Sequence, residues 1–509
     1  MGKRKMVMLR SLLKGVDIIE VDNDVDEEIT GIAYDSRKTG DRSLFVAIRG
    51  FNVDGHDYID EVIKRGAVAI VSERRVKDTI PGTKKVTGIT VSDSRRALAI
   101  ISNNFYRHPS REIKIVGITG TNGKTTTSYL ILSILKSSGF KAGVIGTIGY
   151  TFGDRRLSAP QTTPESLDLQ RLFREMADAG TDYCVLEVSS HSLELDRVFG
   201  SDIDIGVFMN LGHDHLDFHE TIEGYFQSKM KLFSDYDLKR GIVNIDDQWG
   251  REIVKRASTE IMTFGIKEGD IRGEDIEISR DGIRFVASTP IGKTYIESGL
   301  IGYHNVYNIL ASVAIAISQD ISLKQIREGI GLMGGVPGRF EPVDEGQDFF
   351  VVVDYAHTDD ALRNVIMSAR GLTDKRVITV FGCGGDRDKE KRPLMGKVAV
   401  THSDLTIVTS DNPRGEKPRK IVNDIERGIK EVSGRGEYRV ILDRREAIEC
   451  GINEAGPGDI VIIAGKGHET YQIIGDTRVY FDDREAAKEV LRARPKITSH
   501  FSRPDLGQI

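Results

Sequence analysis

The sequence predicts an α/β protein built from three domains. Runs of apolar, mostly β-branched residues recur along the chain, and helical stretches separate them, which is typical of βαβ units with a largely parallel sheet. A chain of 509 residues is long enough for about three domains of roughly 150 residues each. A polar segment with a proline interrupts the pattern at 106–110, and the segment Gly334-Gly-Val-Pro-Gly338 marks a second boundary. We therefore expect domains over residues 1–108, 109–335 and 336–509.

The first domain is predicted to be a small α/β module, the second to hold a mostly parallel sheet, and the third to be Rossmann-like. In sheets of this kind, ligands gather at the carboxyl ends of the strands, so residues directly after each strand are candidates for a site. The expected strands are 45–48 and 67–71 in the first domain, 113–118, 142–148, 183–188 and 203–209 in the second, and 349–353, 377–381, 405–408 and 459–464 in the third.

A glycine-rich loop after the strand at 113–118 carries the strongest signal. Gly120 and Gly123 precede Lys124 and Thr125, and a helical pattern follows. Backbone N–H groups of such a loop can surround phosphate oxygens, the lysine adds a positive charge, and the hydroxyl can bind Mg²⁺. The strict spacing would need a glycine where Ile118 stands, so a plain glycine-rich turn is the alternative. We interpret the segment as a nucleoside triphosphate site in a P-loop ATPase-type domain.

Composition excludes several classes of function. A net charge of −6 without a basic patch argues against a nucleic-acid partner. Three widely spaced cysteines predict neither a disulfide framework nor a zinc site, and they suit a reducing compartment. No apolar stretch has the length of a membrane span. We expect a cytoplasmic monomer without membrane insertion.

Polar segments follow two expected strands of the second domain. Glu187-Val-Ser-Ser-His191 follows the strand at 183–188, and the segment 210–219 contains three histidines and two aspartates. Imidazole and carboxylate groups beside a phosphate site suggest a divalent metal. A polar loop with capping or surface histidines is the alternative.

Seven motifs in this order resemble those of the Mur ligase family, the ATP-dependent amide-forming enzymes of peptidoglycan synthesis. The family's own phosphate loop reads Gly-Thr-Asn-Gly-Lys-Thr, which accounts for the irregular glycine spacing. The motifs are Gly120-Thr-Asn-Gly-Lys-Thr-Thr126, Glu187-Val-Ser-Ser-His191, Asp214-His-Leu-Asp217, Gly302-Tyr-His-Asn-Val-Tyr-Asn308, Gly338-Arg-Phe-Glu341, Asp354-Tyr-Ala-His357 and Gly465-Lys-Gly-His-Glu469.

The resemblance implies ATP and Mg²⁺ as cofactors. It assigns catalytic roles to Lys124, Lys229, His215 and Glu187, with Mg²⁺ held by Thr125, Glu187, His215 and a carbamate formed from CO₂ on Lys229. The nucleotide contacts that it implies are Gly120, Thr121, Asn122, Gly123, Lys124, Thr125, Thr126, Asn305, Asn308, Arg339 and Asp354.

Lys229 depends on the family for its role. Its residue pattern alone describes an ordinary lysine on an amphipathic helix. A lysine cation would repel Mg²⁺, whereas the carbamate is an anionic oxygen ligand. Lys231 is a neighbouring candidate, but only Lys229 has the family's spacing after Tyr225.

Within the family, the chain resembles the members that add the third residue of the stem peptide. The acceptor would be UDP-N-acetylmuramoyl-L-alanyl-D-glutamate, whose carboxylate attacks the γ-phosphate of ATP to give an acyl phosphate before the amine arrives. The implied acceptor contacts are Ser36 in the first domain, followed by Thr162, Thr163, Ser189 and Arg197.

The segment Asp411-Asn412-Pro413-Arg414 resembles the version found in family members that add meso-diaminopimelate. This amino acid differs from lysine by one carboxylate, which a guanidinium can bind with two hydrogen bonds. Further implied contacts are Arg387, Gly465 and Glu469.

Three alternatives stay open: a lysine-adding relative, another superfamily ligase such as a folylpolyglutamate synthase, and a non-catalytic nucleotide-binding regulator.

One departure from the family is Thr358-Asp359, where the family usually has Thr-Pro. Without the ring of proline, the backbone angle φ is not fixed at this point of the loop, so its rigidity is in question.

Overall fold

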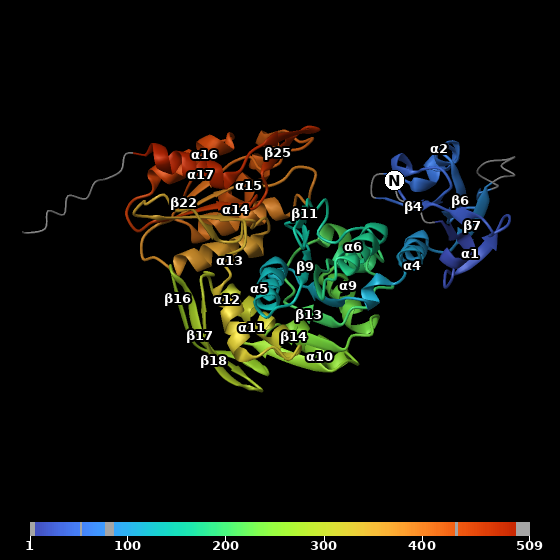
Figure 1. The fold of residues 1–509 in the computed structure, drawn as a ribbon. Coiled ribbons are helices and arrows are strands. Elements are labelled where there is room, and N and C mark those ends of the chain that lie inside the picture. Colours follow the sequence, from blue (N-terminus) through green and yellow to red (C-terminus); the bar gives the residue numbers. More distant parts are fainter. Residues whose placement is uncertain (1–5, 51–52, 77–85, 433–435, 495–509) are drawn as a thin grey trace, which may run out of the picture.

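The computed structural model describes residues 6–50, 53–76, 86–432 and 436–494. Three sheets of five, eleven and six strands form the framework, and each is mostly parallel, which confirms the predicted α/β class. Figure 1 shows the first sheet to one side of the central one, reached through α4 (Ser94–Tyr106). Within the described part of the chain, no helix is long and apolar enough to cross a bilayer.

The first sheet has the order β2-β7-β6-β5-β4, with β2 antiparallel to the rest. The helix α2 (Ile59–Lys64) lies between β5 and β6 in the sequence, and α4 packs against α1 (Leu9–Leu12). Arg107 ends α4 in the left-handed conformation, so the helix ends within the polar segment predicted at 106–110. The strands are β2 (Ile18–Val21), β4 (Gly31–Ala33), β5 (Ser43–Val46), β6 (Ala67–Ser72) and β7 (Thr87–Val91), with a small separate pair β1 (Val7–Met8) and β3 (Glu28–Ile29).

The central sheet has the order β11-β10-β9-β12-β8-β13-β14-β15-β16-β17-β18. In this spatial order, the neighbouring strands from β9 across to β16 run parallel. Antiparallel hairpins extend the sheet at both ends. The strands are β8 (Lys114–Thr119), β9 (Ala142–Ile145), β10 (Tyr150–Phe152), β11 (Arg155–Leu157), β12 (Tyr183–Glu187), β13 (Ile205–Phe208), β14 (Arg240–Asn244), β15 (Ile261–Gly265), β16 (Ile271–Ser279), β17 (Gly282–Thr289) and β18 (Gly292–Ser298).

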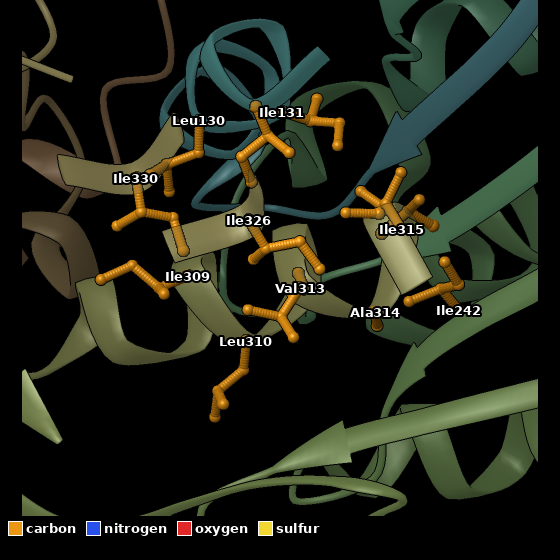
Figure 2. Packing of buried hydrophobic residues seen from close by; sticks show 14 of the residues in the cluster. Leu130, Ile131, Ile242, Ile309, Leu310, Val313, Ala314, Ile315, Ile326 and Ile330 are labelled. Atoms are coloured by element: carbon orange, nitrogen blue, oxygen red, sulfur yellow. The ribbon is translucent and has the colours of Figure 1, made fainter. Parts of the chain in front are cut away.

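Helices cover both faces of this sheet, because its strands are apolar on both sides. One face packs against α5 (Lys124–Ser137), α11 (His304–Ile317) and α12 (Leu323–Gly331). Figure 2 shows Ile309 and Val313 of α11 among Leu130 of α5 and Ile326 of α12. Each such side chain contributes about 1.5–3 kcal/mol when fully buried. The other face packs against α6 (Ser166–Asp178), α9 (Ile222–Ser234) and α10 (Gln248–Arg256).

The third sheet has the order β19-β20-β24-β21-β22-β23, and all but β19 run parallel. The predicted strands correspond to β20, β21, β22 and β24. The strands are β19 (Glu341–Pro342), β20 (Phe350–Asp354), β21 (Val377–Phe381), β22 (Leu405–Val408), β23 (Glu437–Val440) and β24 (Ile460–Ala464). The helices α13 (Asp359–Arg370), α14 (Lys391–His402) and α15 (Pro418–Lys430) cover one face, and α16 (Arg444–Glu454) and α17 (Asp483–Ala493) cover the other.

Candidate functional site

The glycine loop connects β8 to α5, and two of its glycines have backbone angles that side chains rarely adopt. Gly120 has φ +149° and Gly123 has φ +89°. A Cβ at Gly123 would lie 2.4 Å from Oδ1 of Asn308, and one at Gly120 would lie 2.8 Å from Cβ of Met209. Any side chain at these positions would therefore force the loop open.

Lys124 and Thr125 begin α5 directly behind this loop. Lys124 Nζ donates to the carbonyl oxygens of Gly120 (2.7 Å) and Thr121 (2.9 Å). Burial lowers the pKa of Lys124, and the carboxylate of Glu187 opposes this shift. The Thr125 hydroxyl donates to Glu187 Oε2 at 3.0 Å. The predicted triphosphate residues thus surround the amino end of a helix, which favours anions.

Glu187 ends β12 and is fully buried. Besides the bond from Thr125, its carboxylate accepts hydrogen bonds from the backbone N–H (3.1 Å) and the hydroxyl (2.9 Å) of Thr147. Two predicted metal ligands, Thr125 and Glu187, are therefore neighbours, and both offer the oxygen atoms that Mg²⁺ prefers.

His215 stands in a cluster of rings at the start of α8 (Leu216–His219), with φ +53°. Its ring centroid is 4.8 Å from that of His191 and 6.1 Å from that of Tyr225. Its Nε2 lies 3.3 Å from a carboxylate oxygen of Asp214. Burial lowers the pKa of His215, while the charge of Asp214 acts against this shift.

Lys229 lies on α9 and is only 1% exposed. Its Nζ is 4.4 Å from the centroid of the Tyr225 ring. Burial, and after it the positive charge of Lys124, lower the pKa of Lys229 well below its ordinary value. By contrast, Lys231 is partly exposed and pairs with Glu194 at 2.8 Å. Lys229 is therefore the buried amine of the two.

Among the residues that the structure describes, no group of three or more His, Cys, Asp or Glu side chains is arranged to hold a metal. The four predicted metal ligands include only two residues of these types, Glu187 and His215. The predicted metal site therefore does not require a group of three. Among the described residues, no hydrogen bond or ion pair joins Glu187 directly to His215. The charge of Lys124 acts on His215, and the charge of Glu187 acts on Lys124.

Four predicted acceptor contacts meet at the end of β12. The Thr163 hydroxyl donates to the Glu187 carbonyl at 2.7 Å and accepts from the Ser189 N–H at 3.1 Å. Arg197 Nη1 donates to the Thr163 carbonyl at 3.3 Å. The Thr162 and Thr147 hydroxyls are 3.1 Å apart. These residues therefore form one polar surface next to the phosphate loop.

Ser36 is the exception. It begins the short helix η1 (Ser36–Lys38) of the first domain, and no hydrogen bond between described residues joins it to the central site. The two parts are bridged instead by Tyr34, which donates to Asp168 at 2.7 Å, and by Glu165, which contacts Arg95 (3.1 Å) and Arg197 (3.4 Å). These bridging residues were missed, although Glu165 stands two positions after Thr163.

Asn305 and Asn308 occupy one side of α11. Asn308 Nδ2 donates to Asn305 Oδ1 at 2.8 Å, and Asn305 Nδ2 donates to the Ile301 carbonyl at 2.8 Å. Because Asn308 lies against Gly123, the asparagine pair borders the phosphate loop.

Arg339 and Asp354 come from the third part of the chain. Arg339 Nη2 donates to the Thr125 hydroxyl at 3.4 Å, and its guanidinium lies 4.5 Å from the centroid of the Tyr355 ring. Asp354 is buried, and it accepts hydrogen bonds from the N–H groups of Phe340 (2.6 Å) and Ala356 (2.7 Å). Asp354 thus fixes the turn that carries Arg339 toward the phosphate loop.

The departure at Thr358-Asp359 coincides with a helix start. Thr358 caps α13, and its hydroxyl accepts from the Ala361 N–H at 3.3 Å. Asp359 and Asp360 fill the first turn, where negative charge is favourable. Asp360 also accepts a hydrogen bond of 3.2 Å from Asn122 of the phosphate loop. This contact was not predicted.

The predicted amino-acid residues follow β21, β22 and β24. Asn412 Nδ2 donates to Glu469 Oε2 at 2.9 Å, and Arg414 Nη1 donates to the Gly385 carbonyl at 2.8 Å. A Cβ at Gly465 would lie 2.6 Å from Asp411 Oδ2. The structure thus brings Asp411, Asn412, Arg414, Gly465 and Glu469 together. Pro413 precedes Arg414, and the exposed Arg387 borders the same loop at Gly384.

Aromatic rings connect these loops to the phosphate loop. The Tyr355 ring lies 5.1 Å from the His468 ring, and the Thr147 backbone opposes the lowering of the His468 pKa that burial causes. Since Tyr355 contacts Arg339 and Thr147 contacts Glu187, the loops of the second and third sheets border one continuous site.

Three family models match the chain: "Mur ligase family, catalytic domain" at residues 28–106, "Mur ligase middle domain" at 118–316, and "Mur ligase, glutamate ligase domain" at 338–467. The chain is 46% identical over 489 residues to UDP-N-acetylmuramoyl-L-alanyl-D-glutamate--2,6-diaminopimelate ligase of Caldanaerobacter subterraneus subsp. tengcongensis, covering 96% of this chain and 100% of that protein.

Solved structures agree. One described as UDP-N-acetylmuramoyl-L-alanyl-D-glutamate--2,6-diaminopimelate ligase has a TM-score of 0.67 and 33% identity, covering 96% of this chain and 99% of that one. The MurF ligase of Thermotoga maritima, solved in complex with ADP, has a TM-score of 0.62 and 20% identity, covering 91% of this chain and 97% of that one. At this identity the second likeness shows the shared fold.

Proposed function

Because the chain belongs to the Mur ligase family, we propose that it is an ATP-dependent ligase that joins meso-2,6-diaminopimelate to UDP-N-acetylmuramoyl-L-alanyl-D-glutamate in peptidoglycan precursor synthesis. The observation that carries the proposal is the continuity of the site. The glycine loop, the polar surface around Glu187 and the loop of Arg414 border one another. Such a site can hold a triphosphate, an acceptor and an amino acid together.

The reaction joins two substrates through an activated carboxylate. The acceptor carboxylate forms a bond to the γ-phosphorus of ATP, the bond to the β-phosphate oxygen breaks, and ADP leaves. The amine then forms a bond to the acyl carbon and gives up a proton, the bond from that carbon to the phosphate oxygen breaks, and phosphate leaves. Lys124 and Arg339 supply the positive charge that lets two anions approach. Enclosure by loops of two domains keeps water from the acyl phosphate.

Mg²⁺ fits the residues beside the phosphate loop. The hydroxyl of Thr125 and the carboxylate of Glu187 are oxygen donors already in contact, and His215 and a carbamate on Lys229 would complete the ligands. When bound, the ion would offset the negative charge of the phosphate oxygens.

The burial of Lys229 supports its carbamylation. Only an uncharged amine can attack CO₂, and the lowered pKa of Lys229 favours the uncharged form. The product is an anion, which the nearby Lys124 would stabilise.

Arg414 and Arg387 would bind the distal carboxylate of diaminopimelate, and Glu469 would bind its ammonium group. Lysine lacks this carboxylate and would leave the guanidinium groups without a partner, which disfavours it. Gly465, Asp411, Asn412 and Pro413 would shape the pocket.

We assign the acceptor's nucleotide end to residues 1–108, ATP to 109–335 and the amino acid to 336–509, of which 1–5, 51–52, 77–85, 433–435 and 495–509 lie outside the described residues. Ser36 would contact the uridine nucleotide, and the other acceptor residues the peptide. The three free cysteines are consistent with a cytoplasmic protein, which we expect to be monomeric.

The test is phosphate release with ATP, Mg²⁺ and the acceptor, with meso-diaminopimelate or L-lysine offered in parallel. Release with diaminopimelate alone is expected, and Lys124→Ala should abolish it. Release with lysine would leave a ligase but contradict the role of Arg414. Release with neither amino acid would overturn the proposed function.

A further inference from the structure

Two loops that carry the arginines Arg387 and Arg414 are locked together by hydrogen bonds. The Gly385 N–H donates to the Asn412 carbonyl at 2.9 Å. In return, Arg414 Nη1 donates to the Gly385 carbonyl at 2.8 Å. The Gly415 N–H donates to the Asp386 carboxylate at 2.9 Å. The loop after β21 therefore cannot move without the loop after β22.

Both loops contain a residue in a strained conformation. Asp386 has φ +52° and Arg414 has φ +50°, and neither is a glycine. A residue other than glycine keeps such a backbone conformation only where the surrounding structure holds it there. The position of the Arg414 guanidinium therefore depends on contacts outside its own loop.

Arg392 of α14 supplies contacts beneath both loops. Its side chain is fully buried, and it forms a two-pronged ion pair with Glu416, with Nη2–Oε1 at 2.7 Å and Nη1–Oε2 at 3.1 Å. Nη2 also donates to the Gly384 carbonyl at 3.2 Å, and Nη1 contacts Asp424 at 2.9 Å.

Glu416 joins this guanidinium to the strained residues. Its Oε1 accepts the Asp386 N–H at 2.8 Å, and it stands two positions after Arg414. One carboxylate thus contacts the first loop, belongs to the second, and is fixed by Arg392. Loss of Glu416 would leave the buried Arg392 guanidinium with one carboxylate partner fewer, so the groups around it would shift.

We propose that Arg392 and Glu416 are positioning residues that fix Arg387 and Arg414 for binding of the amino acid's distal carboxylate. The proposal rests on the proposed function, because it concerns the same amino-acid site. Neither residue needs to touch the substrate. They act by holding two loops at one distance, and displacement of a binding group by about 1 Å can cost up to roughly a hundredfold in rate.

The test compares Arg392→Lys and Glu416→Gln with the wild type in the phosphate-release assay. Lysine keeps the charge but loses the two-pronged geometry. We expect the KM for meso-diaminopimelate to rise about tenfold to a hundredfold. The KM values for ATP and the acceptor, and kcat at saturating diaminopimelate, should stay close to the wild-type values.

The matched control is Arg376→Lys. Arg376 also makes two hydrogen bonds to one carboxylate, from Nε (3.0 Å) and Nη2 (2.8 Å) to Asp459 Oδ2, but it directly precedes β21, at the end of the strand away from the loop of Arg387. Its KM for diaminopimelate should not change. If Arg392→Lys fails to fold by circular dichroism, Asp424→Asn removes only one partner of Arg392 and should give a smaller rise in the same KM.

An unchanged KM for diaminopimelate in folded Arg392→Lys and Glu416→Gln would overturn the proposal. An equal rise for all three substrates would also overturn it, because that result indicates general destabilisation. A wild-type protein without diaminopimelate-dependent release would overturn the proposed function, and this role with it. The two failures are distinguishable, since only the second is seen in the unmodified protein.

Discussion

Burial changes the chemistry that single side chains of this site can perform. Lys229 and Lys231 stand two positions apart on α9, yet one is buried beside a tyrosine ring and the other pairs with Glu194 at the surface. Burial lowers the pKa of the Lys229 amine well below its ordinary value. The difference follows from helix geometry, because residues two apart face different sides.

Lys229→Ala should lower phosphate release by about a hundredfold or more, as expected for loss of a charged group at the reacting phosphates. Lys231→Ala should stay active, because its side chain faces solvent. Removing dissolved CO₂ should lower wild-type activity, and bicarbonate should restore it. Activity retained in Lys229→Ala would refute the carbamate role.

The ion pair of Glu416 predicts a pH effect on stability. Arg392 lowers the pKa of the Glu416 carboxyl from 4.5 to about 2. Because the folded-state pKa lies below the ordinary value, the stabilisation is complete above about pH 4.5 and is lost as the pH falls toward 2. The difference in unfolding free energy between wild type and Glu416→Gln should therefore shrink from pH 7 to acidic pH, measured by urea unfolding. A constant difference would contradict this.

Sequence patterns identify residues of the candidate site more readily than residues that position other side chains. Lys124 and Glu187 stand in recognisable positions after strands, and the structure places both at the phosphate loop. Arg392 and Glu165 gave no such signal, since a charged residue is usually exposed and only the fold shows that these are buried. Whether the predicted residues perform their roles stays a prediction.

At the scale of elements, Asp359 stands at the first position of α13, where the family usually has a proline, and Thr358 caps this helix. Thr358 has an extended backbone with ψ 160°, which is the conformation required before a proline. The first helical position also accepts proline readily.

Asp359→Pro should therefore keep the fold and raise the unfolding free energy by roughly 0.5 kcal/mol, through lower entropy of the unfolded chain. Thr358→Ala should lower it by about 1 kcal/mol, since the cap is lost, and Thr358→Ser should restore most of it. Urea unfolding measures both changes. Destabilisation by Asp359→Pro would show that the aspartate charge matters more than the backbone angle.

Parallel strands were easier to predict than antiparallel ones. The strands β12 and β24 are buried on both faces, so their sequences are continuous apolar runs. The hairpins of β16, β17 and β18 have one exposed face, and their alternating polar residues were not assigned. The strands β25 (Tyr471–Ile474), which is partly buried, and β26 (Thr477–Tyr480), which is exposed, were also missed, because neither is an apolar run.

At the scale of the whole molecule, few polar contacts connect the third domain to the phosphate loop. Asn122 donates to Asp360, and Arg339 donates to Thr125. The order of the domains could be predicted from motifs, but these contacts join residues more than two hundred positions apart, and no local pattern indicates them.

Asp360→Ala should raise the KM for ATP about fivefold, because one hydrogen bond contributes roughly 1 kcal/mol. Asp359→Ala is the matched control, because it removes a carboxylate from the same helical turn that does not accept the hydrogen bond from Asn122. The KM for the acceptor should change little in either variant. Equal effects of the two substitutions would indicate helix destabilisation instead of a lost domain contact.

The eleven-stranded sheet has a consequence for how the molecule behaves in concentrated solution. An open sheet ends in two strands whose outer backbone groups can pair with another chain and start aggregation. Here β11 presents the exposed side chains of Arg155 and Arg156, and β18 presents Lys293 and Glu297. A second chain approaching either edge would have to strip water from these charges. The hairpins that lengthen the sheet thus also shield it from growing further.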